Sequence, residues 1–277
     1  MIDGFDLDAF VRSTLAEDLG TGGDVTSQAV IPADARLAAE MASRDAVTVA
    51  GLEIGAAFFR ALDAAASVTL FAKDGDRVAA GAALMRIVGN ARALLTAERS
   101  ALNTVQHLTG IATMTRAYAD AIAGTGCILL DTRKTLPGLR VIEKYATRMG
   151  GAQNHRMRLD DGVLIKDNHV AVAGGVAAAV RAAKSAGLSL PVQVEVDRID
   201  QIEPALAAGA DRLLLDNMPP PVLREAVALI AGRVLTEASG GVNLMTIRAI
   251  AETGVTYVSV GRLTQSAPAA DIGLDYA

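Results

Sequence analysis

The fold is decided by six apolar, β-rich runs: CILLD (127–131), VLIK (163–166), VQVEV (192–196), RLLLD (212–216), VLTEA (234–238) and YVSVG (257–261). Alanine-rich stretches with helical spacing lie between most of them, at 176–186, 199–208, 222–231 and 244–253. Uniformly apolar strands that alternate with helices are typical of a parallel sheet covered on both faces. Six such units without a Gly-x-Gly-x-x-Gly motif favour a closed or nearly closed barrel over a dinucleotide-binding fold.

The first hundred residues predict a separate, mixed α/β unit. Helical spacing of apolar residues extends over 5–19 and again over 91–123, with a break expected near Thr109–Gly110. Short β-like runs lie between these helices, at 37–42, 47–50, 68–72 and 84–88. The change from this mixed pattern to the regular strand–helix alternation indicates two domains.

Composition excludes several classes of protein. Of the 277 residues, 51% are hydrophobic, which is enough to form a core and excludes disorder. The formal net charge of −5 argues against a protein that binds nucleic acid or an anionic membrane. A single cysteine rules out an internal disulfide and fits a reducing cytosol. Because neither a signal peptide nor a membrane-spanning segment is recognisable, we expect a cytoplasmic protein.

Charged side chains stand at or next to the ends of five of the six runs: Asp131, Lys166, Glu195, Asp216 and Glu237. An isolated charge inside a barrel would cost several kcal/mol. At the carboxyl ends of parallel strands the same residues would converge on one pocket. The alternative is that each residue merely ends its strand in a loop.

Cations are concentrated between Asp131 and His169, where eight Lys and Arg residues face five acids. Arg133-Lys134 follows a strand end directly, and His155-Arg156 shortly precedes the next strand, so both pairs should face the mouth of the barrel. The arginine fork matches carboxylate and phosphate groups. We therefore expect a pocket for a polyanion, with Glu195 and Asp216 opposite to bind hydroxyl groups or a divalent metal. A solvated helix face is the alternative for Arg140, Lys144 and Arg158.

Glycine-rich turns follow the last two strand runs. Ser239-Gly240-Gly241 comes after one run and Gly261 ends the other. In α/β barrels the loops after the last strands often bind phosphate through backbone N–H groups. These turns predict a phosphate-binding site.

The chain resembles the quinolinate phosphoribosyltransferase family along nearly its whole length. The motifs that carry the resemblance are ERSALN (98–103), TGIAT (109–113), DTRKTLPGLR (131–140), EKYA (143–146), NHR (154–156), LIKDNH (164–169), LDN (215–217), ASGG (238–241) and SVG (259–261). The Asp-Thr-Arg-Lys-Thr run with the Asn-His-Arg downstream of it is highly specific.

The resemblance implies an N-terminal α/β sandwich over 1–109 and an incomplete, roughly seven-stranded α/β barrel over 110–266, with the tail 267–277 returning to the first domain. It also implies transfer of the phosphoribosyl group of phosphoribosyl pyrophosphate to quinolinate, with decarboxylation to nicotinate mononucleotide in de novo NAD biosynthesis. A homodimer is implied, in which Arg99 reaches the partner's active site.

The resemblance also implies roles for individual residues. The two carboxylates of quinolinate would be held by Arg99, Arg133, His155 and Arg156. Substrate carboxylate and pyrophosphate oxygens would be contacted by Lys134 and Lys166, and Thr132 belongs to the substrate-binding set. Glu195 and Asp216 would bind the ribose hydroxyls and Mg²⁺, and together with the two lysines they form the expected catalytic set. The 5′-phosphate would be cradled by Ser239, Gly240, Gly241 and Gly261.

Four positions depart from the family pattern: Met149, Ala152, Gln193 and Gln265. Gln193 stands where many members have a glutamate, and Ala152 could alter the loop that carries His155. Three other functions stay open: a related phosphoribosyltransferase that is linked to molybdenum transport or uses nicotinate, an aldolase-like barrel with Lys166 as a Schiff-base lysine, and a non-catalytic anion-binding protein.

Overall fold

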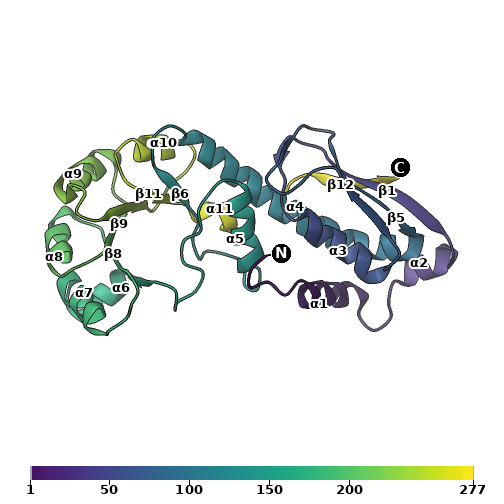
Figure 1. The fold of residues 1–277 in the computed structure, drawn as a ribbon, viewed down its shortest axis with the longest axis horizontal. Coiled ribbons are helices and arrows are strands. Elements are labelled where there is room, and N and C mark those ends of the chain that lie inside the picture. Colours follow the sequence, from purple (N-terminus) through teal and green to yellow (C-terminus); the bar gives the residue numbers. More distant parts are fainter. Residues whose placement is uncertain (1, 277) are drawn as a thin grey trace. The chain divides into compact units, whose positions relative to one another are not determined.

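The computed structural model describes residues 2–276, which form two compact units (Figure 1). The first unit is Met1–Arg116, Val141–Gly150 and Ala267–Ala277, and the second is Ala117–Arg140 and Gly151–Ser266. Compared with the expected division at residue 110, the first unit also takes in α5 (Arg140–Met149). Two contacts explain this grouping: Glu143 accepts a hydrogen bond from His107 at 2.8 Å, and the Tyr145 hydroxyl donates to Asp74 at 2.6 Å.

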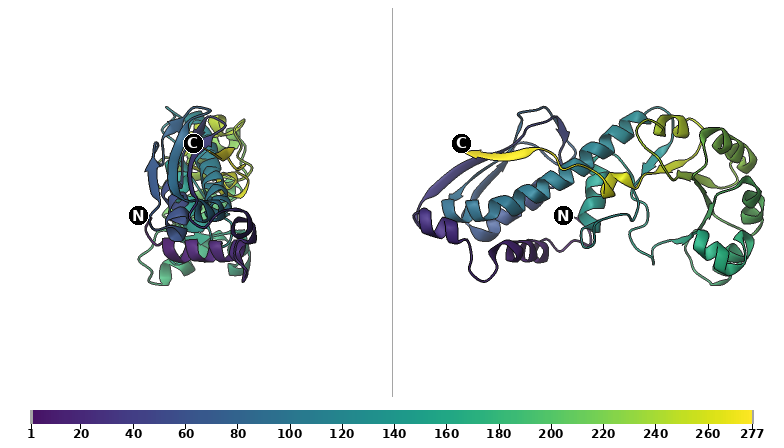
Figure 2. Two further views of the ribbon diagram at one scale, coloured as in Figure 1. Left: turned by 90° about the vertical axis from the view of Figure 1, so that its right-hand side faces the viewer. Right: turned by 180° about the vertical axis from the view of Figure 1, so that it is seen from behind.

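An antiparallel sheet forms the centre of the first unit, in the order β12 (Ile272–Tyr276), β1 (Arg36–Ser43), β5 (Ala83–Asn90) and β3 (Ser67–Leu70). A second, two-stranded sheet pairs β2 (Val47–Thr48) with β4 (Arg77–Val78). Besides α5, the helices of this unit are α1 (Leu7–Leu19), α2 (Val25–Val30), α3 (Leu52–Leu62) and most of α4 (Ala91–Ala121). Figure 2 shows α4 lying along the sheet. Apolar side chains fill the space between the layers, and Met41, Met85, Phe58 and Phe59 are fully buried.

The expected break in the helix near Thr109–Gly110 is wrong, because α4 continues without interruption from Ala91 to Ala121. Gly110 instead allows a close approach of the C-terminal tail. A Cβ at this position would overlap the carbonyl oxygen of Pro268 and lie 3.0 Å from its carbonyl carbon. Glycine is therefore used here for packing and does not end the helix.

A parallel sheet forms the centre of the second unit, in the order β6 (Ile128–Leu130), β11 (Tyr257–Ser259), β10 (Leu235–Ser239), β9 (Arg212–Asp216), β8 (Val192–Val196) and β7 (Val163–Ile165). A parallel bridge between Leu130 and Gln153 adds a seventh position beyond β6. All six predicted strands are present. The fold class is therefore confirmed as α/β, with an incomplete barrel in this unit.

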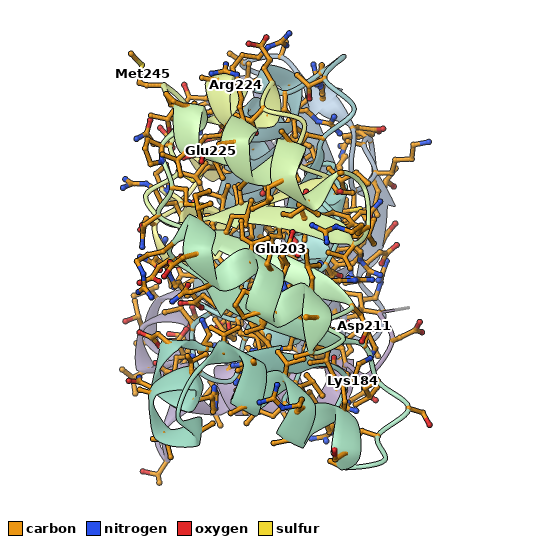
Figure 3. The ribbon with its side chains drawn as sticks, turned by 90° about the vertical axis from the view of Figure 1, so that its left-hand side faces the viewer. Lys184, Glu203, Asp211, Arg224, Glu225 and Met245 are labelled. Atoms are coloured by element: carbon orange, nitrogen blue, oxygen red, sulfur yellow. The ribbon has the colours of Figure 1, made fainter. Side chains whose placement is uncertain are left out.

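Short helices connect these strands, namely α6 (Asp167–Ala173), α7 (Val176–Ser185), η1 (Ile199–Gln201), α8 (Ile202–Ala207), α9 (Pro220–Ile230) and α10 (Ile247–Ala251), and α11 (Arg262–Gln265) follows the last of them. Their inner faces are apolar, as Val180 and Leu223 show. Their outer faces carry charges, and Figure 3 shows Glu203 and Glu225 on this surface. Among residues 2–276 no helix is both long and apolar enough to cross a bilayer.

Candidate active site

A cavity of about 740 Å³ opens at the carboxyl ends of the parallel strands of the second unit. Lys166 directly follows β7, Glu195 lies near the end of β8, and Asp216 ends β9. Glu237 and Gly261 contribute from β10 and from the residues after β11. Parallel strands place their carboxyl ends at one edge, so residues far apart in sequence line one hollow.

All but one of the predicted site residues line this cavity: Thr132, Arg133, Lys134, His155, Arg156, Lys166, Glu195, Asp216, Ser239, Gly240, Gly241 and Gly261. The remaining one, Arg99, is an exposed residue of α4 in the first unit. The cavity therefore brings together the predicted cations, carboxylates and glycines of the second unit.

Asp131 plays a different part from the other charged strand ends. It is fully buried, and its carboxylate accepts hydrogen bonds from the backbone N–H of His155 at 2.8 Å and from the side-chain amide of Asn154 at 2.6 Å. Backbone bonds from Gln153 to Leu129 and from Asp131 to Gln153 hold the same loop to β6. The strand-end acid thus positions the loop that carries His155 and Arg156.

Two arginines form the cationic side of the cavity. The Nε of Arg133 is buried and has no hydrogen-bond partner within residues 2–276. Arg156 donates from Nη1 to the carbonyl oxygen of Gly162 at 3.0 Å. Burial, followed by the neighbouring charge of Arg133, lowers the pKa of Arg156. Since two guanidinium groups so placed repel each other, an anion in the cavity would be stabilised by both.

Glu195 and Asp216 form the carboxylate side of the same cavity. Glu195 accepts from the Nζ of Lys166 at 3.3 Å, and Asp216 accepts from the side-chain amide of Asn217 at 2.6 Å. Burial raises the pKa of Glu195, and the neighbouring Asp216 raises it further against the effect of Lys166. Burial also raises the pKa of Asp216. Desolvated carboxylates of this kind gain free energy from a bound cation.

The glycine turn after β10 packs closely against Asn217, a residue with a left-handed backbone conformation. Gly240 has φ +90°, and a Cβ there would overlap the side-chain oxygen of Asn217. Asn217 itself has φ 54°, and its N–H donates to the carbonyl of Ser239 at 2.9 Å. At Gly261 a Cβ would lie 2.7 Å from the Cδ of Lys134. The two turns are therefore kept free of side chains where the backbone borders the cavity.

Several lining residues were not singled out from the sequence as site residues: Asp167, Asn217, Glu237, Asn243, Arg262 and Gln265. The position of Glu237 next to a strand end indicated that it would lie at the mouth of the barrel, but nothing in the sequence indicated its hydrogen-bond partners. Asn217 carried only the motif in which it follows Asp216. Its left-handed backbone conformation becomes visible only in the structure.

The donor set can be compared with the needs of a metal ion. Among residues 2–276 no group of three or more His, Cys, Asp and Glu side chains is arranged to hold a metal. Glu195 and Asp216 offer two carboxylates in the same cavity. Mg²⁺ usually keeps several waters and binds one or two carboxylates together with substrate phosphates. The pair therefore fits Mg²⁺ that arrives with a phosphorylated substrate.

Comparison with known proteins gives one result along the whole chain. The family models for the C-terminal and N-terminal domains of quinolinate phosphoribosyl transferase match residues 111–275 and 24–109. A nicotinate-nucleotide pyrophosphorylase (carboxylating) of Mycobacterium leprae is 44% identical over 273 residues, covering 96% of this chain and 95% of its own. The chloroplastic enzyme of the same name from rice is 43% identical, covering 98% of this chain and 77% of its own.

A solved structure leads to the same family. The nicotinate-nucleotide pyrophosphorylase of Francisella tularensis has a TM-score of 0.94 and 39% identity, covering 100% of this chain and 99% of its own. The family models, the sequence relatives and this structure all point to the family that the motifs lining the cavity resemble. The chain belongs to the quinolinate phosphoribosyltransferase family.

Proposed function

We propose that this protein transfers the phosphoribosyl group of phosphoribosyl pyrophosphate to quinolinate, with release of pyrophosphate and CO₂, and so makes nicotinate mononucleotide for de novo NAD synthesis. The observation that carries the proposal is the meeting of a cationic side and a carboxylate side in one cavity. The family to which the chain belongs supplies the identity of the two substrates. We propose a cytoplasmic location for this activity, as expected from the composition.

The cationic side is suited to a dicarboxylate. Arg133, His155 and Arg156 form the proposed seat for the two carboxylates of quinolinate, with Arg99 supplied by a second copy of the chain in a homodimer. The buried, unpartnered Nε of Arg133 gains an acceptor when a carboxylate binds. A buried donor without a partner costs about 1–3 kcal/mol, so this gain favours an anionic ligand.

The carboxylate side is suited to the activated sugar. Glu195 and Asp216 would accept hydrogen bonds from the ribose hydroxyls, while Lys134, Lys166 and Thr132 would bind pyrophosphate and carboxylate oxygens. Mg²⁺, held by Glu195 and Asp216 together with the substrate, would neutralise charge on the pyrophosphate. The turns at Ser239, Gly240, Gly241 and Gly261 would hold the 5′-phosphate through backbone N–H groups.

The reaction needs orientation and electrostatic stabilisation, and no covalent enzyme intermediate. As the bond from C1 to pyrophosphate breaks, positive charge develops on the ribose, and the nearby carboxylates stabilise it. The lysines stabilise the departing anion. The pyridine nitrogen then bonds to C1, the ring becomes cationic, and the adjacent carboxylate leaves as CO₂, with a proton from solvent taking its place on the ring.

The geometry argues against the Schiff-base alternative. Such lysines are activated by a desolvated pocket or by a neighbouring cation. The side chain of Lys166 is 51% exposed, and its Nζ lies 3.3 Å from a carboxylate oxygen of Glu195, so neither condition is met. The nicotinate-using and molybdenum-linked alternatives, and an inert anion-binding protein, are separated from the proposal by substrate choice and by CO₂ release.

Release of CO₂ from carboxyl-labelled quinolinate tests the proposed function. We expect release only when phosphoribosyl pyrophosphate and Mg²⁺ are both present, with one nicotinate mononucleotide formed for each CO₂. Nicotinate, which lacks the second carboxylate, should be a much poorer acceptor. Tight quinolinate binding without CO₂ release would favour the anion-binding alternative, and preferred use of nicotinate would favour the related transferase.

Loss of either arginine of the cationic side should weaken quinolinate binding. Arg133→Ala and Arg156→Ala are expected to cost about 2–5 kcal/mol, the range for breaking a buried, hydrogen-bonded charge pair. Titration calorimetry with quinolinate measures the change, and Arg224→Ala on the exposed face of α9 is the matched control. Unchanged affinity in both site variants would contradict the assignment.

The raised pKa values of Glu195 and Asp216 predict an acid limb in the rate profile. Both groups are needed as carboxylates, so kcat/KM for phosphoribosyl pyrophosphate should fall as pH drops through their raised pKa values. Because protonation begins at a higher pH than for ordinary carboxyl groups, the fall should begin above pH 4.5, the usual glutamate value. A rate that stays level down to that pH would contradict the assigned roles.

Mixed dimers test the proposed contribution of Arg99. Arg99→Ala and Lys134→Ala homodimers should each have little activity, whereas co-expressed, differently tagged subunits should regain part of it in the mixed dimer. Recovery is expected because one of its two sites then has both residues intact. If purified mixed dimers were as inactive as the parents, Arg99 would not be shared between subunits.

A further inference from the structure

A row of buried polar contacts lies beside the proposed quinolinate seat. Gln193 donates from its side-chain amide to Oε2 of Glu237 at 2.7 Å, and both residues are buried, with 5% and 3% of their surface exposed. Oε2 of Glu237 also lies 3.3 Å from Nε2 of His155. On the other side of the ring, the backbone N–H of Arg156 donates to Nδ1 of His155 at 2.7 Å. The contacts therefore run from Gln193 to Arg156.

The donors and acceptors in this row determine which nitrogen of the His155 ring carries a proton. A backbone N–H can only donate, so Nδ1 of His155 must accept and carries no proton. Burial raises the pKa of Glu237, but the hydrogen-bonding and electrostatic contact with His155, followed by the hydrogen bonds with Ser259 and Gln193, outweighs burial, and the net pKa shift is downward. Glu237 is thus an anion and accepts, so Nε2 of His155 carries the proton.

We propose that Glu237 is a positioning residue, which fixes His155 in the tautomer protonated at Nε2 and thereby holds the His155–Arg156 corner of the seat. Gln193 holds the same carboxylate oxygen from the opposite direction. Both ring nitrogens are engaged by the protein, so His155 contributes to the proposed seat by holding Arg156, while the arginines supply its positive charge. The ligand named here rests on the proposed function, whereas the tautomer does not.

The charge of Glu237 and its hydrogen bond to His155 should have opposite effects on quinolinate binding. Its carboxylate borders a cavity proposed to bind an anion, so by charge alone its removal would strengthen quinolinate binding. If Glu237 acts by accepting a hydrogen bond from Nε2–H, its removal lets the ring turn and weakens quinolinate binding. A change to leucine removes both charge and acceptor, whereas a change to glutamine removes the charge and keeps an acceptor oxygen.

Quinolinate affinity of these variants separates the two effects. We expect Glu237→Leu to raise the Kd about tenfold or more, and Glu237→Gln to raise it less than about threefold, because the amide oxygen can still accept. Glu225→Leu, the same change on the exposed face of α9 (Figure 3), should leave the Kd unchanged. Unchanged or tighter binding in Glu237→Leu would overturn the proposal.

A double-mutant cycle tests whether Glu237 acts through His155. In a His155→Ala background, Glu237→Leu should not weaken quinolinate binding any further. Independent, multiplicative losses would mean that Glu237 does not act through the ring, and would overturn the proposal. Thermal melting of each variant shows whether it has kept its fold.

The tautomer can be read in the unaltered protein, which covers the case in which Glu237→Leu does not fold. With ¹⁵N-labelled histidine, His155 should show a protonated Nε2 and an unprotonated Nδ1. Only three histidines are present, so a His155→Gln sample assigns the signals. A proton on Nδ1 would overturn the proposal whatever the enzyme's substrate. Absence of CO₂ release together with the expected tautomer would contradict the proposed function alone.

Discussion

At the carboxyl end of β6 the buried Asp131 carboxylate accepts the backbone N–H of His155 and the side-chain amide of Asn154. A buried carboxylate requires such partners, because an unpaired one would cost several kcal/mol. The interaction ties the loop that follows Gln153 to the strand that leads into Thr132 and Arg133. Both halves of the cationic side are thereby fixed to one strand end, and the proposed dicarboxylate seat depends on this contact.

Further strand ends of the incomplete barrel supply the carboxylate side. Successive parallel strands end in Lys166, Glu195 and Asp216, and each side chain enters the same cavity because all the strands run in one direction. Burial raises the pKa of both carboxyl groups. A cavity with fixed cations on one side and desolvated carboxylates on the other suits a reaction that separates charge between a sugar and its leaving group. Orientation and electrostatics can then carry the chemistry.

Much of the barrel and its site was predictable from the sequence, because both follow from local patterns. Uniformly apolar runs predicted the six parallel strands, and the charges at their ends predicted the cavity. Non-local packing has no signal in these local patterns, and only the resemblance implied that the tail returns to the first domain. Gly110 suggested a helix break, but the tail at Pro268 packs against it, and β12 pairs with β1 although its five residues carry no distinctive pattern. The role of Arg99 came from the resemblance alone.

Within the site, partners were harder to predict than positions. Asp131 and Glu237 were both recognised as charged strand ends, yet the first holds a loop and the second faces His155. Neither hydrogen bond has a sequence signal, because each joins residues more than twenty positions apart. The left-handed backbone of Asn217 and the close approach of Gly240 to its side chain likewise have no sequence signal.

The proposed reaction requires that the cations of 133–156 and the carboxylates of the strand ends bind their ligands in one cavity. A crystal structure of the protein with bound quinolinate tests it most directly. We predict one ligand carboxylate about 2.8 Å from the Nε of Arg133 and the other beside Arg156, with the pyridine nitrogen facing Glu195 and Asp216. Quinolinate bound elsewhere, or these arginines directed to separate surfaces, would contradict it.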